Sequence, residues 1–195
     1  MKNSVSITKS SSEIIILLII YFIILVVVGI IKSNILIDIL PTELVYTAKI
    51  SSYVSIVISS IISAIVIGLI IGMLFFFNVI FDININENNL VSSFDNPVLV
   101  FIVFELIKFT LAYFMLENEI SRISFSDNFL EEIKLTSWYL YDTILKYLMI
   151  FISTITYCFT LYNREKEIKI SVLIIFSIVL LTGFYISTID FFDNI

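Results

Sequence analysis

Long apolar stretches alternate with short polar ones along the chain. Residues 14–31 contain no charged side chain, and as a helix they rise about 27 Å, close to the thickness of the hydrocarbon core of a bilayer. Four further stretches are strongly apolar: 51–81, 98–116, 138–161 and 170–189, of which 98–116 and 138–161 each contain two charged residues. The pattern predicts an all-α fold, a polytopic membrane helix bundle that forms a single integral membrane domain over residues 1–195.

A sixth crossing is possible at residues 34–49, where charges interrupt short apolar runs. This segment is either an interfacial helix or a weak crossing that only surrounding protein could shield, because lipid penalises charges at its centre. Residues 51–81, by contrast, are longer than a crossing requires. As a helix they rise about 46 Å and must tilt, bend or extend beyond the bilayer. Gly68 and Gly72, with Phe76 one turn on, are the candidates for a bend or a π-bulge, or for close packing against a neighbour.

Polar segments connect the crossings. Residues 82–97 read as a turn-rich loop, and 117–137 as an acidic segment whose second half predicts a short amphipathic helix capped by Ser126 or Asp127. Five basic residues fall on the N-terminal side of the membrane and four on the other: Lys2, Lys9, Arg164, Lys166 and Lys169 against Lys32, Lys49, Arg122 and Lys134. This balance does not fix the orientation.

The amino-acid composition excludes several kinds of binding site and catalytic chemistry. There is no His, so no imidazole can bind a metal or act as a base. The single Cys158 excludes an intrachain disulfide, and the net charge of −6 argues against nucleic acid as a partner. Phosphate-loop, dinucleotide, HExxH and CxxC motifs are absent. We therefore expect no cofactor bound by this chain alone.

Codon usage explains a second bias. The chain has 42 Ile and 18 Phe but only 4 Gly and 3 Ala, although membrane helices normally use Gly and Ala where they pack together. Ile and Phe have A/T-rich codons, whereas Gly and Ala have G/C-rich ones. The bias indicates an A/T-rich genome, which favours a mitochondrial inner membrane or the inner membrane of a bacterium with a reduced genome.

Two pairs of ionisable residues lie inside the apolar stretches. Glu105 and Lys108 are three residues apart and share a helix face, and Asp142 and Lys146 are four apart. Such groups normally face a bundle interior or a water-filled cavity. Each pair is a candidate proton relay, or alternatively a neutralised pair that fixes helix register. The neighbouring Trp138, Tyr139 and Tyr141 predict an interfacial aromatic belt.

The stretch 66–85, VIGLIIGMLFFFNVIFDINI, resembles the third transmembrane helix of NADH dehydrogenase subunit 6 of respiratory complex I, at Gly68, Ile70, Phe76, Asp82 and Ile83. A second stretch, FELIKFTLAYFM, is similar to the helix of complex I subunit 4L that carries a buried Glu. These resemblances imply a core membrane-arm subunit that binds neither NADH nor flavin, and in which Glu105 and Asp142 would be relay carboxylates.

Three functions remain open from the sequence. The first is a membrane-arm subunit of proton-pumping NADH:ubiquinone oxidoreductase, whose partners are other membrane subunits of a hetero-oligomeric complex and the lipid bilayer. The second is an accessory structural subunit of another respiratory or organelle complex. The third is a small independent multispan scaffold or transporter, although a transporter is expected to show inverted repeats or broken helices.

Overall fold

A computed structural model describes residues 2–38, 40–121 and 129–188, and over these residues the chain is helical with no strand. The elements are α1 (Lys2–Ile37), α2 (Thr42–Ile80), α3 (Glu87–Ser92), α4 (Asp95–Leu111), the π-helical segment η1 (Ala112–Leu116), α5 (Glu117–Ile120), α6 (Phe129–Lys134), α7 (Ser137–Arg164) and α8 (Ile170–Ser187). Five helical stretches are long and apolar enough to cross a membrane, with α3, α4, η1 and α5 together forming the third. The predicted all-α bundle of an integral membrane protein is confirmed.

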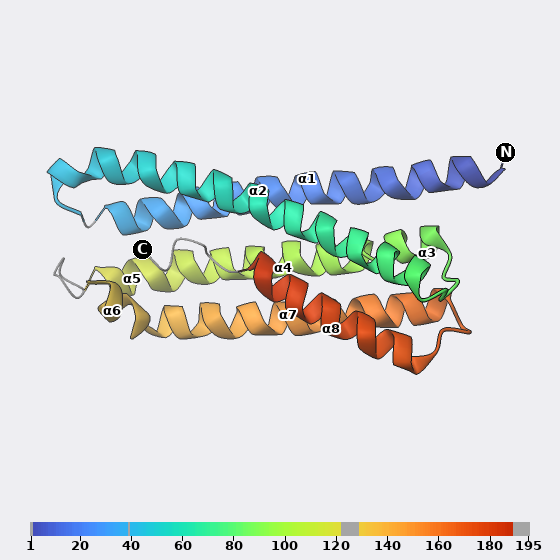
Figure 1. Ribbon diagram of the computed structural model, residues 1–195. Coiled ribbons are helices and arrows are strands. Elements are labelled where there is room, and N and C mark those ends of the chain that lie inside the picture. Colours follow the sequence, from blue (N-terminus) through green and yellow to red (C-terminus); the bar gives the residue numbers. More distant parts are fainter. Residues whose placement is uncertain (1, 39, 122–128, 189–195) are drawn as a thin grey trace.

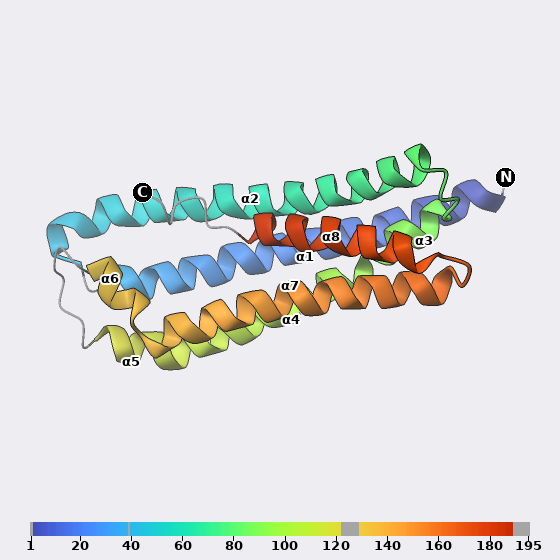
Figure 2. The same ribbon diagram turned by 60° about the horizontal axis from the view of Figure 1, so that its bottom comes forward.

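The long helices lie side by side (Figures 1 and 2), and their contacts close into a ring. Going round it, α1 packs against α2, α2 against α8, α8 against α7, α7 against α4, and α4 against α1. Helices α1 and α4 run in the same direction, and α4 and α7 run in opposite directions. Each helix therefore has two neighbours and turns one face toward the centre of the ring and another outward.

The possible sixth crossing at 34–49 is not a separate helix. Helix α1 continues to Ile37 and α2 begins at Thr42, so the polar residues of this segment extend two crossings and form the turn between them. Pro41 immediately precedes α2, where a proline is tolerated because the first N–H groups of a helix have no partner within it. Lys, Ser and Asn do not break a helix, which is why the charges near residue 32 did not end α1.

The predicted loop 82–97 contains the short helix α3, whose first turn is capped by the side chain of Asn86. Asp82 and Asn84 have positive φ angles and turn the chain after α2. The buried side chain of Asn78 holds the loop, since it donates to the carbonyl of Ile85 and accepts from its N–H, both at 3.0 Å. These two bonds fix the entry into α3.

The acidic segment 117–137 contains α5 and α6, so the predicted short helix is present at Phe129–Lys134. The predicted capping residues Ser126 and Asp127 lie outside the described residues. Helix α7 then begins at Ser137, where the Thr136 side chain accepts a hydrogen bond from the N–H of Tyr139.

Aromatic side chains fill the centre of the ring. The Phe101 ring of α4 lies 5.6 Å from the Tyr21 ring of α1 and 5.0 Å from the Phe184 ring of α8, measured between centroids. All three side chains are buried. This cluster joins the first, third and fifth crossings.

Two glycines allow close approach between helices, but they are not the two that the sequence singled out. A Cβ atom at Gly29 of α1 would lie 2.7 Å from Ile56 of α2, and one at Gly183 of α8 would lie 2.5 Å from Ile70 of α2. A Cβ atom at Gly68 or Gly72 would meet nothing within 4 Å. Within the chain, α2 is therefore packed through glycines of its neighbours, and its own two glycines lie on the outer face of the ring.

Candidate functional site: a buried charge network

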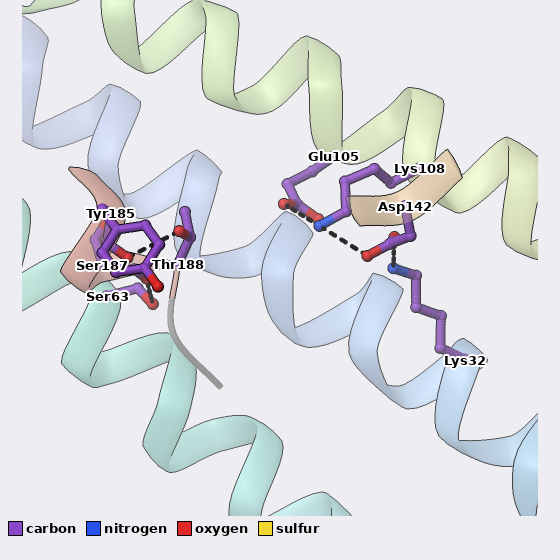
Figure 3. A network of polar contacts seen from close by, with 8 residues as sticks. All are labelled: Lys32, Ser63, Glu105, Lys108, Asp142, Tyr185, Ser187 and Thr188. Atoms are coloured by element: carbon purple, nitrogen blue, oxygen red, sulfur yellow. Dashed lines mark hydrogen bonds and ion pairs between the residues drawn. The ribbon is translucent and has the colours of Figure 1, made fainter. Parts of the chain in front are cut away.

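Four ionisable side chains from three helices form one continuous network inside the bundle (Figure 3). The Lys32 ammonium of α1 lies 3.1 Å from Oδ1 of Asp142 in α7. The other carboxylate oxygen of Asp142, Oδ2, lies 3.7 Å from Nζ of Lys108 in α4. Lys108 in turn lies 3.2 Å from Oε1 of Glu105. Two ammonium groups thus face two carboxylates, and the network is neutral as a whole.

The half of the network on α4 is more deeply buried than the half formed by Lys32 and Asp142. The side chains of Lys32 and Asp142 are 19% and 23% exposed, whereas those of Lys108 and Glu105 are 11% and 8% exposed. A single charge at the centre of a membrane helix costs about 2.5–3.5 kcal/mol, and pairing offsets this cost only when the geometry is good. The nitrogen–oxygen distances of 3.1, 3.7 and 3.2 Å supply such pairing for each of the four side chains.

Three of the four members of this network were predicted from the sequence. The pair of Glu105 and Lys108 is present as expected from the spacing of three residues. Asp142 is in the network too, but it pairs with Lys32 and Lys108 rather than with Lys146. Among the described residues Lys146 has no ion pair or hydrogen bond, and it is half-buried on α7.

Lys32 is the member that the sequence did not single out, because it follows the apolar run 14–31 and looked like a loop residue. A signal was nevertheless present. Tyr21, Val28 and Lys32 are spaced by seven and four residues, which places them on one helix face, and Tyr21 and Val28 are both buried. Lys32 therefore continues the inward face of α1.

Trp138, one of the three residues of the predicted aromatic belt, lies beside the network. Its side chain is buried, and the Lys32 ammonium lies 5.7 Å from the centre of its ring. The backbone N–H of Trp138 donates to Oε2 of Glu119 at 3.1 Å. A cation over an indole face is attracted by the π electrons. Tyr139 and Tyr141, by contrast, are exposed, as expected for a belt.

The one π-helical segment among the described residues lies next to the network. The segment η1 begins four residues after Lys108, and such turns are frequent at functional sites because they leave part of the backbone ladder unsatisfied. The sequence placed a candidate π-bulge near Gly68, Gly72 and Phe76, but α2 is α-helical throughout. Phe76 is exposed on the outer face. A bend of α2 in another state stays a prediction.

No protein family, curated protein or solved structure matches the chain. Within the described residues, no group of three or more Cys, Asp or Glu side chains could hold a metal ion. Fold and site together define an integral membrane protein, a ring of five crossings that encloses a neutral network of paired charges. The network is the feature of this fold that bears on function.

Proposed function

We propose that the chain is a membrane subunit of a proton-translocating complex and that the network Lys32–Asp142–Lys108–Glu105 carries protons part of the way across the membrane. The observation that supports this is the continuity of the network. It leads from two partly exposed groups to the buried Glu105, through nitrogen–oxygen distances of 3.1, 3.7 and 3.2 Å. Intramembrane carboxylates and amines in such rows are typical of proton relays.

The pairing also suits the chemistry of transfer. When the Lys108 ammonium gives a proton to the Glu105 carboxylate, the products are a neutral amine and a neutral acid. The total charge is unchanged, and two buried charges disappear at once, which a low-dielectric environment favours. The Asp142 carboxylate then takes a proton from the Lys32 ammonium and passes it to the neutral Lys108 amine, and Lys32 regains a proton from the partly exposed side.

The resemblances to complex I subunits support a particular host complex. We propose the membrane arm of NADH:ubiquinone oxidoreductase, in a mitochondrial or bacterial inner membrane, with other membrane subunits around the ring. In this role the chain contributes helix packing and one proton step, while the redox chemistry takes place elsewhere.

One observation favours a second candidate, an accessory structural subunit. The same four groups join α1, α4 and α7, three of the five crossings. Buried polar contacts can specify which arrangement of helices forms. In this role the network would set the register of the helices and carry no protons.

Replacing Glu105 with Gln separates the two candidates, because Gln keeps the size and polarity of the side chain but cannot take up a proton. The tagged chain would be purified with its complex, placed in vesicles, and tested for proton uptake with a pH-sensitive dye. A relay predicts that uptake falls by about 100-fold while the complex still assembles on native gels. Glu117→Gln, an exposed change in α5, is the matched control.

Loss of assembly in Glu105→Gln with normal uptake per assembled complex would favour the structural candidate. Native electrophoresis with in-gel NADH oxidation tests the host complex separately. A band that contains the tagged chain but does not oxidise NADH would argue against complex I.

A further inference from the structure

Lys146 of α7 is the charged residue of the two predicted pairs that the network leaves out. Its side chain is half-buried, and among the described residues it forms no ion pair or hydrogen bond. Ionisable groups inside membrane helices are costly and normally serve a function. The contacts between α4 and α7 determine which groups lie at the depth of Lys146.

Lys146 belongs to the inward face of α7. Asp142, Lys146, Met149, Ser153 and Tyr157 follow one another at spacings of four, three, four and four residues, which keeps them on one side of the helix. Met149, Ser153 and Tyr157 are buried. The Lys146 side chain is therefore attached to the face of α7 that packs into the bundle.

The corresponding face of α4 carries Glu105. Phe94, Val98, Phe101, Glu105 and Lys108 follow one another at spacings of four, three, four and three residues, and the first four of them are buried. Both members of the predicted pair on α4 thus lie on the inward side of this helix.

Two contacts between these faces fix the register of the antiparallel helices α4 and α7. Near one end, the centre of the Phe94 ring lies 4.6 Å from that of Tyr157. Further along, Nζ of Lys108 lies 3.7 Å from Oδ2 of Asp142. The two contacts are separated by 14 residues on α4 and by 15 on α7, so the register is kept between them.

This register brings Glu105 and Lys146 to one depth. Glu105 precedes Lys108 by three residues and Lys146 follows Asp142 by four, so on antiparallel helices both lie about one turn further into the bundle. Counting from the aromatic contact gives the same result, because each residue is 11 positions from its ring. The flexible four-carbon stem of a lysine can carry its nitrogen to a carboxyl on a facing helix.

The C-terminal end of α8 lies at the same depth. Helix α8 runs in the same direction as α4 (Figure 1), and the Phe184 ring lies 5.0 Å from the Phe101 ring. Glu105 follows Phe101 by four residues, and α8 ends at Ser187, three residues after Phe184. Figure 3 shows this end, where the Ser187 carbonyl accepts a hydrogen bond from Ser63 at 2.8 Å. The C-terminal end of a helix is partly negative and stabilises a cation near it, and α8 packs against α7.

We propose that Lys146 accepts the proton of Glu105 and is the inner end of the proton path. This rests on the proposed function of the network. Protonated Glu105 gives its proton to the nitrogen of Lys146 in its amine form, which leaves a carboxylate and an ammonium that pair across the two helices. A carboxylate or water of a neighbouring subunit takes the proton from the ammonium, and Glu105 receives the next one from Lys108. Both side chains return to their starting forms, and one proton moves in each passage.

Two changes of Lys146 test this in the vesicle assay of the full complex. We expect Lys146→Gln to lower proton uptake by about tenfold, which corresponds to a barrier increase of about 1.4 kcal/mol, with little change in the temperature of unfolding. Lys146→Arg should lower uptake equally, because Arg keeps the positive charge but does not release a proton. A role in charge or packing alone predicts instead that Arg preserves uptake.

Lys49→Gln is the matched control, because Lys49 is also half-buried and has no ion pair among the described residues. It should leave uptake unchanged, and a loss equal to that of Lys146→Gln would overturn the specific role of Lys146. Normal uptake in Lys146→Arg would overturn that role too, and this variant decides alone if Lys146→Gln does not assemble.

The proposal and the function on which it rests fail differently. Normal uptake in Lys146→Gln, together with lost uptake in Glu105→Gln, would overturn the role of Lys146 and leave the network standing. Normal uptake in Glu105→Gln would overturn the proposed function itself.

Discussion

Lys32 and Asp142 are 110 residues apart in sequence, yet the Lys32 ammonium lies 3.1 Å from the carboxylate of Asp142. This contact connects the first crossing to the fourth across the interior of the ring.

The first prediction is that Lys32 matters for stability and Lys146 does not. Lys32→Gln leaves Asp142 with only the longer contact to Lys108, and breaking a buried pair costs up to about 3 kcal/mol. Lys146→Gln removes a lysine without an ion pair and should change the free energy of unfolding by less than about 1 kcal/mol. Unfolding in mixed micelles measures both. Equal effects of the two changes would contradict the structure.

The second prediction is that Lys32 and Asp142 are energetically coupled. A double-mutant cycle with Lys32→Gln and Asp142→Asn should give a coupling energy of about 1 kcal/mol or more, as expected for residues in one ion-pair network. The pair Lys146→Gln and Asp142→Asn should give a value near zero. The same unfolding assay supplies all the values.

The third prediction concerns the glycines. Gly29→Ala should destabilise the bundle by about 1–3 kcal/mol, because the new Cβ meets Ile56, and the β-branched Ile56 has little rotamer freedom in a helix. Gly68→Ala should be neutral or stabilising by up to about 1 kcal/mol, since Ala favours helix and the space is open. A larger loss for Gly68→Ala than for Gly29→Ala would show that the outer face of α2 is covered in the intact complex.

The fourth prediction concerns the turn after α2. Asn78→Ala removes both hydrogen bonds to the backbone of Ile85 and should destabilise the turn by about 1–3 kcal/mol. Faster hydrogen exchange at the amide of Ile85 would reveal the loss. The exchange of amides in α8, far from this turn in the chain, is the internal reference and should not change.

Much of the fold could be predicted from the sequence, because lipid requires long apolar helices and the chain displays five of them. The residues at which these helices begin and end were harder to predict. Polar residues can continue a helix beyond the membrane, so α1 passes Lys32 and α2 begins at Thr42 rather than at residue 51. Hydropathy predicts which residues lie in the membrane, whereas the ends of a helix depend on capping and turn residues.

The charge network could be predicted only where it is local. The spacing of Glu105 and Lys108 puts them on one face of one helix, so sequence alone suffices for that pair. The contact between Lys32 and Asp142 depends on which helices are neighbours, and so do the close approaches at Gly29 and Gly183. These contacts depend on how the helices are arranged in the ring, and the apolar pattern of each single helix does not predict that arrangement.

The position of α8 has a consequence for biosynthesis. This helix occupies the place between α2 and α7, and its Phe184 completes the aromatic cluster around Phe101. Until Ile170–Ser187 has entered the bilayer, the four earlier crossings form an open arc with an aromatic seam turned toward lipid. The last of the five crossings to leave the ribosome therefore locks the assembly, and a translation product that stops before Ile170 would expose that seam to other nascent membrane proteins.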